Sequence, residues 1–207
     1  MAITAADVKK LRDATGAGMM DAKRALTEAE GDFDKAIELL RISGLAKAAK
    51  RADREATNGI VAGRDGALIQ FASETDFVAK NGEFVGLADD ILAAVIASGA
   101  KDVAATNEAS LASGAKVADA VAELGAKIGE NLSVVNAANF DGATHLYLHR
   151  RAADLPPQVG VVVGYSGDDA PHGDTFLAVR RRVPVVLTVV DRPGRIRRWW
   201  RLVDEIT

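Results

Sequence analysis

The spacing of apolar residues over the first 44 positions predicts three short amphipathic helices. Apolar side chains recur there every three or four residues, which is the period of a helix with one buried face. Asp7 follows Thr4 by three residues, an arrangement typical of the N-terminal cap of a helix. The glycines expected to end the three helices are Gly16, Gly31 and Gly44. Three such helices bury only a small core, which is typical of a binding module.

The pattern changes after residue 44. Residues 45–58 are rich in Ala and in charged side chains and have little apolar face, which indicates a solvated connecting helix. Residues 59–73 contain two apolar strands around a Gly-rich turn at 63–66, which predicts a β-hairpin. The elements predicted beyond the hairpin are helices at 82–98 and 117–128 and strands at 131–140 and 144–151. This order of elements indicates an α+β fold after the helical module.

A short sequence echo links two parts of this second region. "GIVAGRDG" at 59–66 and "GVVVGYSG" at 160–167 share apolar residues before a glycine-containing turn. Glycine permits a positive φ in such a turn, and the apolar residues before it suit a buried strand. Eight residues with three glycines can also match by chance, so the pattern alone leaves both internal duplication and coincidence open.

Composition narrows the class of protein and its compartment. The 207 residues are 48% hydrophobic and 27% charged, which is typical of a globular protein, and they include no cysteine. Disulfides and thiol chemistry are thereby excluded, and a reducing compartment is expected. The first twenty residues carry charges throughout, unlike a signal peptide, and no apolar run approaches the roughly 20 residues that span a membrane. We therefore expect a cytoplasmic protein without membrane contact.

The sequence lacks the usual patterns of a catalytic or nucleotide-binding site. The cluster "GRDG" has neither the Lys nor the Ser or Thr that completes a phosphate-binding loop. His145 and His149 fall on one face of a predicted strand, but no cysteine or acid cluster completes a metal site. The surroundings of Ser73 do not resemble a nucleophile elbow. We expect no enzyme activity, no metal and no cofactor, and a function carried by contact surfaces.

The first candidate contact surface is "TGAGMMDAKRAL", residues 15–26. Two adjacent methionines begin a predicted helix there and cannot both face one small core, and Met side chains adapt well to interfaces. The alternative is that Met20 faces the core together with Ala25 and Leu26, and that Met19 is incidentally exposed.

The second candidate is "SETDFVAKN", residues 73–81, which joins a predicted strand to a predicted helix. Asp76 and Phe77 place a carboxylate beside a large aromatic ring in this connection. A partner contact is one interpretation. The alternative is that Asp76 caps the following helix while Phe77 folds beneath it.

Three longer motifs make the chain resemble the elongation factor Ts family of bacterial translation. They are "VKKLRDATGAGMMDAKRAL", "ETDFVAKN" and "AKIGENL", in the family's order and at suitable spacing over about residues 1–169. The resemblance implies a ubiquitin-associated-like three-helix domain followed by an α+β core of two related subdomains, of which the second is incomplete. It also implies that the hairpin echo is an internal duplication. The implied divisions are 1–44 for the helical domain, 45–58 for the linker, 59–139 and 140–169 for the two core subdomains, and 170–207 for a divergent tail.

The resemblance further implies a guanine-nucleotide exchange factor that acts in translation elongation. Its partner would be elongation factor Tu, bound to GDP or free of nucleotide, from which it promotes GDP release by disturbing the magnesium and phosphate site. Carried over by position, Asp76 and Phe77 match the pair that enters the partner's nucleotide-binding domain. The other implied contacts are Ile128 and Gly129 at the end of a helix, His149 in the second subdomain, and Met19, Met20 and Lys23 in the N-terminal module.

The tail departs from the family after about Asp169. Residues 174–207 contain 8 Arg, no Lys and 4 acidic residues, whereas the preceding residues hold 18 basic and 25 acidic ones. A shifted reading frame of GC-rich coding DNA would give such a composition; real divergence and an RNA-binding tail that uses Trp199 and Trp200 are the alternatives. The alternative function is therefore an exchange-inactive or RNA-binding module, and no contact with DNA is expected.

Overall fold

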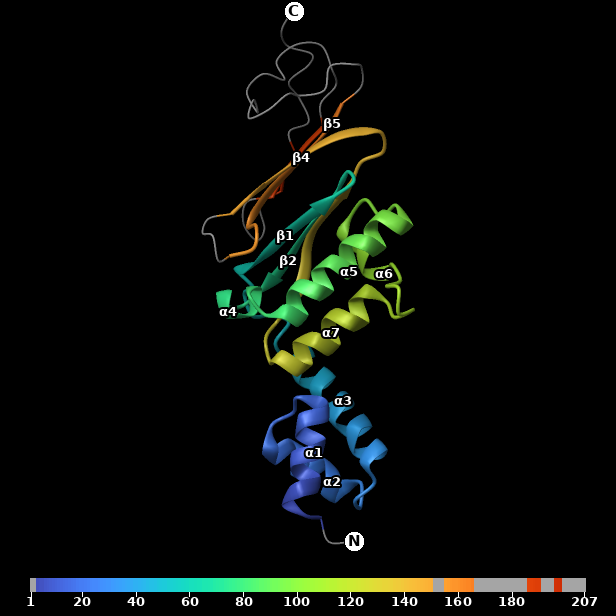
Figure 1. The fold of residues 1–207 in the computed structure, drawn as a ribbon, viewed down its shortest axis with the longest axis vertical. Coiled ribbons are helices and arrows are strands. Elements are labelled where there is room, and N and C mark those ends of the chain that lie inside the picture. The colour runs from blue at the N-terminus through green and yellow to red at the C-terminus, as the bar shows by residue number, and fades with distance from the viewer. Residues whose placement is uncertain (1–2, 151–154, 166–185, 191–195, 199–207) are drawn as a thin grey trace, which may run out of the picture. The chain divides into compact units, whose positions relative to one another are not determined.

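The computed structural model describes residues 3–150, 155–165, 186–190 and 196–198. These residues form two compact units. The first consists of residues up to Glu55 together with Asp119–Leu132, and the second contains Ala56–Ala118 and the chain from Ser133 onward. Figure 1 labels the helices of both units and the strands β1, β2, β4 and β5.

Unit 1 begins with three helices: α1 (Ala5–Thr15), α2 (Met19–Glu28) and α3 (Phe33–Ala49). The predicted cap at Thr4 is confirmed, since its hydroxyl accepts from the N–H of Asp7 while the Asp7 carboxylate accepts from the N–H of Thr4. Gly16 ends α1 with a φ of 70°. The fully buried core residues are Val8, Leu11, Ala22, Ala25, Leu26, Ala29 and Ala36.

Two details of the predicted helical module are wrong. Met20 does not face the core, because its side chain is 77% exposed and Ala22 occupies the buried position on the same helix. Gly44 does not end α3, which continues through the Ala-rich stretch to Ala49. A Cβ on Gly44 would lie 3.1 Å from the Cβ of Ala126, so this glycine allows close packing within the unit and does not serve as a stop.

Unit 2 contains a three-stranded antiparallel sheet in the order β1-β2-β3. Its strands are β1 (Asn58–Arg64), β2 (Ala67–Ser73) and β3 (Ser133–Asn139). The predicted hairpin is confirmed and turns at two residues, Asp65 with a φ of 51° and Gly66 with a φ of 82°. Positive φ at both central positions is the requirement of the tight turn that suits the twist of paired strands, and Asp-Gly is a favoured pair for it.

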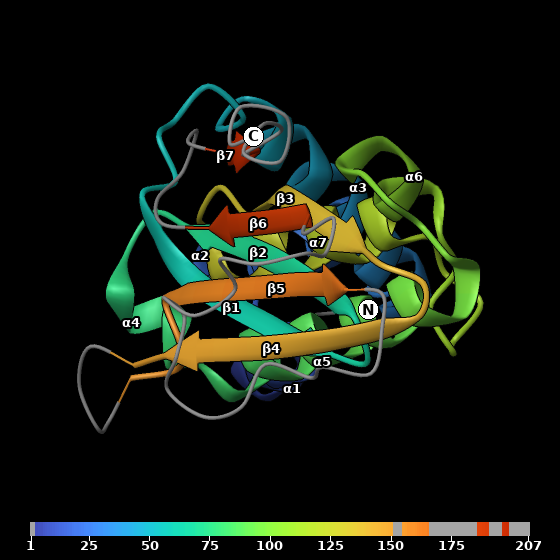
Figure 2. The ribbon, with the colours of Figure 1, turned by 90° about the horizontal axis from the view of Figure 1, so that it is seen from above.

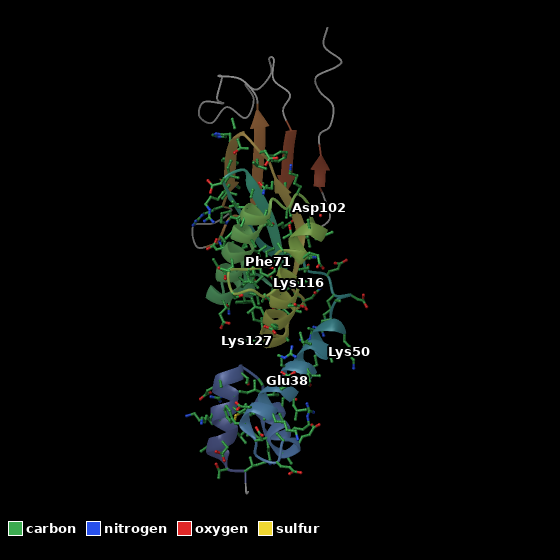
Figure 3. All side chains as sticks on the ribbon, turned by 90° about the vertical axis from the view of Figure 1, so that its right-hand side faces the viewer. Glu38, Lys50, Phe71, Asp102, Lys116 and Lys127 are labelled. Atoms are coloured by element: carbon green, nitrogen blue, oxygen red, sulfur yellow. The ribbon has the colours of Figure 1, made fainter. Side chains whose placement is uncertain are left out.

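Helices cover one face of this sheet. They are α4 (Asp76–Ala79), α5 (Gly82–Ser98), which confirms the helix predicted at 82–98, and α6 (Val103–Glu108). The rings of Phe71 on β2 and Phe84 on α5 are both fully buried and stack with centroids 4.3 Å apart (Figure 3). The helix predicted from Val117 is also confirmed as α7 (Val117–Ile128), most of which belongs to unit 1.

A second antiparallel sheet packs on the other face of the first (Figure 2). It has the order β4-β5-β6-β7 and consists of β4 (Ala143–His149), β5 (Val159–Tyr165), β6 (Val186–Val190) and β7 (Ile196–Arg198). Val61, Leu68 and Val162 form the buried contact between the sheets. The sheets approach closely at Gly160, where a Cβ would lie 2.5 Å from a methyl carbon of Val61.

The divergent tail therefore contributes two strands to a sheet. β6 pairs with β5 on one side and β7 on the other, so its backbone is not an open edge. β5 pairs antiparallel with β6, as β1 does with β2, and the internal duplication stays a prediction. Residues 166–167 of the sequence echo and the Trp199–Trp200 pair lie outside the described residues. The predicted domain boundaries stay predictions. Within the described residues, no helix combines the length and apolar character needed to cross a membrane.

Candidate partner-binding surfaces

Phe77 is the most exposed large apolar side chain in the described part of the chain. It lies in α4, a four-residue helix between β2 and α5, and 82% of its surface is accessible. Val78 and Ala79, the next two residues, are buried. The short helix is thus anchored from one side and presents Phe77 on the other, beside the exposed carboxylate of Asp76.

The alternative in which Asp76 caps the long helix and Phe77 folds beneath it is wrong. The cap of α5 is Asn81, whose side-chain oxygen accepts from the N–H groups of Glu83 at 2.8 Å and Phe84 at 3.3 Å. Because Asn81 satisfies these backbone groups, the Asp76 carboxylate is not required at this helix end.

Two side-chain bonds hold the connection that precedes α4. The Ser73 hydroxyl donates to the carbonyl of Thr75 at 2.8 Å, and the Asn58 amide donates to the carbonyl of Glu74 at 2.8 Å. Ser73 is fully buried, so the first bond ties the connection to the sheet. These bonds restrict the backbone on which the exposed Phe77 is mounted, which lowers the entropy that a contact would cost.

His149 ends β4 on the face of the second sheet that points away from the first. Leu146 and Leu148 pack toward the core between the sheets, and Tyr147 and His149 alternate with them on the outer face. The Tyr147 hydroxyl lies 3.1 Å from Nδ1 of His149. This bond orients the imidazole and leaves Nε2 as the nitrogen offered to a partner.

The three predicted contacts in the N-terminal module lie together on the first turns of α2. Met19 is 46% exposed, Met20 is 77% exposed, and Lys23 is also exposed. Asp21 lies between them and accepts from Lys47 Nζ at 2.8 Å and from Arg24 at 2.7 Å. The Lys47 hydrogen bond, aided by the charges of Lys47 and Arg24, holds the pKa of Asp21 below its ordinary value.

Ile128 and Gly129 lie at the C-terminal end of α7, in the same unit as α2. Gly129 has a φ of 90°, and its N–H donates to the carbonyl of Gly125 at 2.8 Å, which is the geometry of a glycine helix stop. No described atom comes within 4 Å of the position of a Cβ on Gly129. The side chain of Lys127, the residue before Ile128, lies over Gly16 (Lys127 is labelled in Figure 3).

The structure thus groups the predicted contacts into two sets. Met19, Met20, Lys23, Ile128 and Gly129 belong to unit 1. Asp76, Phe77 and His149 belong to unit 2, where α4 and β4 supply them. Ile128 and Gly129 are half-buried, and the other six are exposed.

Two further exposed apolar side chains were not among the predicted contacts. They are Ile42 on α3, which is 53% exposed, and Tyr147, which is 42% exposed. The alternation of "THLYLH" could have indicated Tyr147, since it shares a strand face with His149. Among the described residues, no three His, Asp or Glu side chains gather as metal ligands would.

Comparison with known proteins gives the context for these surfaces. A family model described as "Elongation factor TS" matches residues 74–183, which is more than half of the chain. The chain belongs to the elongation factor Ts family. The match passes residue 169, where the sequence had been expected to leave the family, so the predicted end of the resemblance is too early.

Curated relatives named elongation factor Ts match about four fifths of this chain. The elongation factor Ts of Cutibacterium acnes is 63% identical over 175 residues, which is 84% of this chain and 65% of that relative. The proteins of the same name from Mycolicibacterium vanbaalenii and Mycolicibacterium smegmatis are 60% and 58% identical over 166 and 170 residues. The chain spans about three fifths of the length of these relatives, 61% and 62% for the latter two.

Proposed function

We propose that this chain is a translation elongation factor that binds elongation factor Tu and promotes the release of its GDP. Family membership supports the general role. The exposed ring of Phe77 is the single observation that carries the proposed mechanism, because a large apolar side chain in water favours burial against another surface. The action needs no catalytic group, metal or cofactor of the chain's own, and the cytoplasm is its proposed compartment.

The proposed mechanism assigns separate roles to Asp76 and Phe77. Phe77 would enter a pocket of the partner and supply apolar binding energy. Asp76 would bring a negative charge toward the region that holds Mg²⁺ and the GDP phosphates, where like charges repel. Mg²⁺ requires near-ideal octahedral geometry, so a small displacement of its ligands weakens its hold on the nucleotide.

Thermodynamic linkage explains why binding of the chain would favour GDP release. If the chain binds nucleotide-free elongation factor Tu more tightly than the GDP form, the affinity of elongation factor Tu for GDP must be lower in the complex by the same factor. The other predicted contacts, on α2, at the end of α7 and at His149, would supply affinity that does not depend on the nucleotide. Such contacts hold the partner while the pair at α4 discriminates between its two states.

Release of a fluorescent GDP analogue from elongation factor Tu tests the proposal. Substoichiometric amounts of the chain should accelerate release in a stopped-flow measurement, since each molecule acts repeatedly. Complex formation without acceleration, seen by size-exclusion chromatography, would instead favour an exchange-inactive binder. Strongly salt-dependent binding to single-stranded RNA, lost when the chain is cut after residue 170, would favour the RNA-binding alternative.

A further inference from the structure

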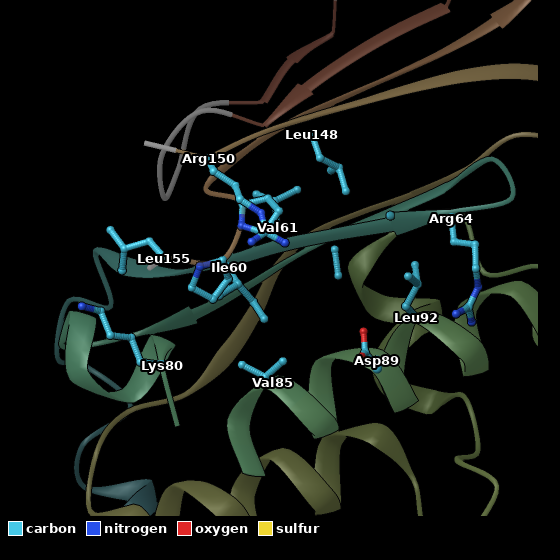
Figure 4. A pocket seen from close by; sticks show the side chains of 14 residues that line it. Ile60, Val61, Arg64, Lys80, Val85, Asp89, Leu92, Leu148, Arg150 and Leu155 are labelled. Carbon is cyan, nitrogen blue, oxygen red and sulfur yellow. The ribbon is translucent and has the colours of Figure 1, made fainter. Parts of the chain in front are cut away.

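A groove of about 530 Å³ runs along the outer edge of β1, within unit 2 (Figure 4). Val85, Asp89 and Leu92 of α5 form one wall. Leu148 and Arg150, at the end of β4, form the other. The floor is the edge strand itself, residues 60–64, so the groove is a slot between a helix and a second sheet with a strand edge at its base.

The backbone at the base of this slot is partly unpaired. The N–H of Val61 points away from β2, because it donates to the carbonyl of Pro157 at 2.8 Å. Backbone groups alternate in direction along an antiparallel strand, so those of Gly63 point the same way as those of Val61. On that side, no backbone group in the described part of the chain pairs with Gly63. Among the described residues, one segment pairs with the start of this edge, and Gly63 carries the next outward-facing backbone groups.

More of the charged side chains that line the slot are positive than negative. Three cationic side chains line it, Arg64, Lys80 and Arg150, against the carboxylate of Asp89, and Arg64 also lies 3.5 Å from the carboxylate of Asp65, so Arg150 is the cation on which the charge argument rests. Arg64 ends β1, Lys80 follows α4 and Arg150 follows β4; Figure 4 shows Lys80 and Arg64 on opposite sides and Arg150 beside Val61. The remaining lining residues are apolar apart from the backbone of Gly63. A ligand that matches this lining carries negative charge and small apolar side chains.

We propose that this groove binds an extended, acidic peptide segment of another protein, which adds to β1 as a fourth strand of the first sheet. Main-chain bonds to Gly63 and its neighbours would supply affinity, and the cations would select acidic side chains. Pro157 already pairs with Val61, so the edge left for a ligand is residues 62–64, which span roughly 10 Å and pair with a segment of three or four residues. A second copy of β1 is a poor occupant, because it would bring its own Arg64 toward these cations.

Three acetylated and amidated hexapeptides test this site directly. The first is Thr-Val-Glu-Val-Glu-Thr, the second carries Lys in place of both Glu residues, and the third is the acidic peptide with alternate backbone nitrogens methylated. Titration into the isotopically labelled full chain should shift the amide resonances of residues 60–64, with the Gly63 amide protected from hydrogen exchange. We expect the Lys peptide and the N-methylated peptide to bind at least tenfold more weakly.

A charge-reversal variant with a matched control completes the test. Arg150→Glu should weaken the acidic peptide by roughly fivefold or more, whereas Lys9→Glu, an exposed cation in unit 1, should leave its affinity within about twofold. An unchanged amide spectrum away from the groove would show that Arg150→Glu is folded. Equal binding of the three peptides, the largest shifts elsewhere in the chain, or no binding at millimolar peptide would each overturn the proposal. The peptide titration does not measure GDP release, so its result tests this site alone and not the proposed exchange function.

Discussion

Replacing Phe77 by Ala removes the apolar ring on which the proposed exchange mechanism depends. The ring is 82% exposed in the free chain, so about four fifths of its surface is available for burial against a partner. Full burial of a Phe side chain is worth about 1.5–3 kcal/mol, which gives about 1.2–2.5 kcal/mol for this fraction. At about 1.4 kcal/mol per factor of ten, kcat/KM for GDP release should fall roughly 7- to 60-fold.

The same substitution should leave the fold intact. Phe77 contributes little buried surface, so the free energy of unfolding should change by less than about 0.5 kcal/mol. Ile42→Ala is the matched control, since Ile42 is also a large apolar residue, 53% exposed, that lies outside the predicted contacts. Stopped-flow release of a fluorescent GDP analogue and urea unfolding should be measured on both variants. A Phe77→Ala variant that releases GDP within twofold of the unaltered chain, while Ile42→Ala behaves alike, would refute the reasoning.

Three further predictions concern the framework that carries these surfaces. Phe84→Ala should cost about 3–5 kcal/mol in urea unfolding, because it leaves a cavity beside the stacked ring of Phe71; a cost below about 1 kcal/mol would contradict the packing described. Asn81→Ala should cost about 0.5–2 kcal/mol in the same measurement, since it removes the cap of α5, and an unchanged midpoint would argue against that cap. Lys47→Met should raise the pKa of Asp21 toward its ordinary value in a carboxylate NMR titration, and an unchanged pKa would show that Lys47 is not the cause of the shift. Because the pKa of Asp21 is lowered in the folded chain, the stability that this pair contributes is fully present above about pH 3.9 and is lost as the pH falls through the lowered pKa.

Local signals were enough to predict much of the fold. The hairpin follows from Asp65 and Gly66, which tolerate the positive φ that its turn requires. The helix at 82–98 follows from the spacing of its apolar residues, although its cap is Asn81 and not Asp76, the cap that the sequence offered. In both cases the residues that decide the element lie within it or next to it, so a single sequence contains the information.

Long-range packing accounts for what the sequence did not predict. Gly44 was expected to stop a helix, but its lack of a side chain accommodates Ala126, which lies 82 positions away in the sequence. The groove along β1 likewise depends on Arg150 and Pro157 reaching an edge nearly a hundred residues earlier. For Phe77, the sequence pattern left a core position and a partner contact equally open, and only its exposure in the structure excluded the core.

The two-part construction of unit 1 has a consequence for how the chain folds as it is synthesised. α3 and the residues after it have partners in residues 119–132: Arg41 faces Glu123 at 4.0 Å, and the Asn131 amide donates to the carbonyl of Ala52 at 3.2 Å. A nascent chain that has not yet emerged as far as residue 119 can form the small core of the first three helices but lacks these contacts. Since residues 56–118 lie between the two parts of unit 1, β1, β2 and the helices α4 to α6 must be synthesised before residues 119–132 can complete that unit.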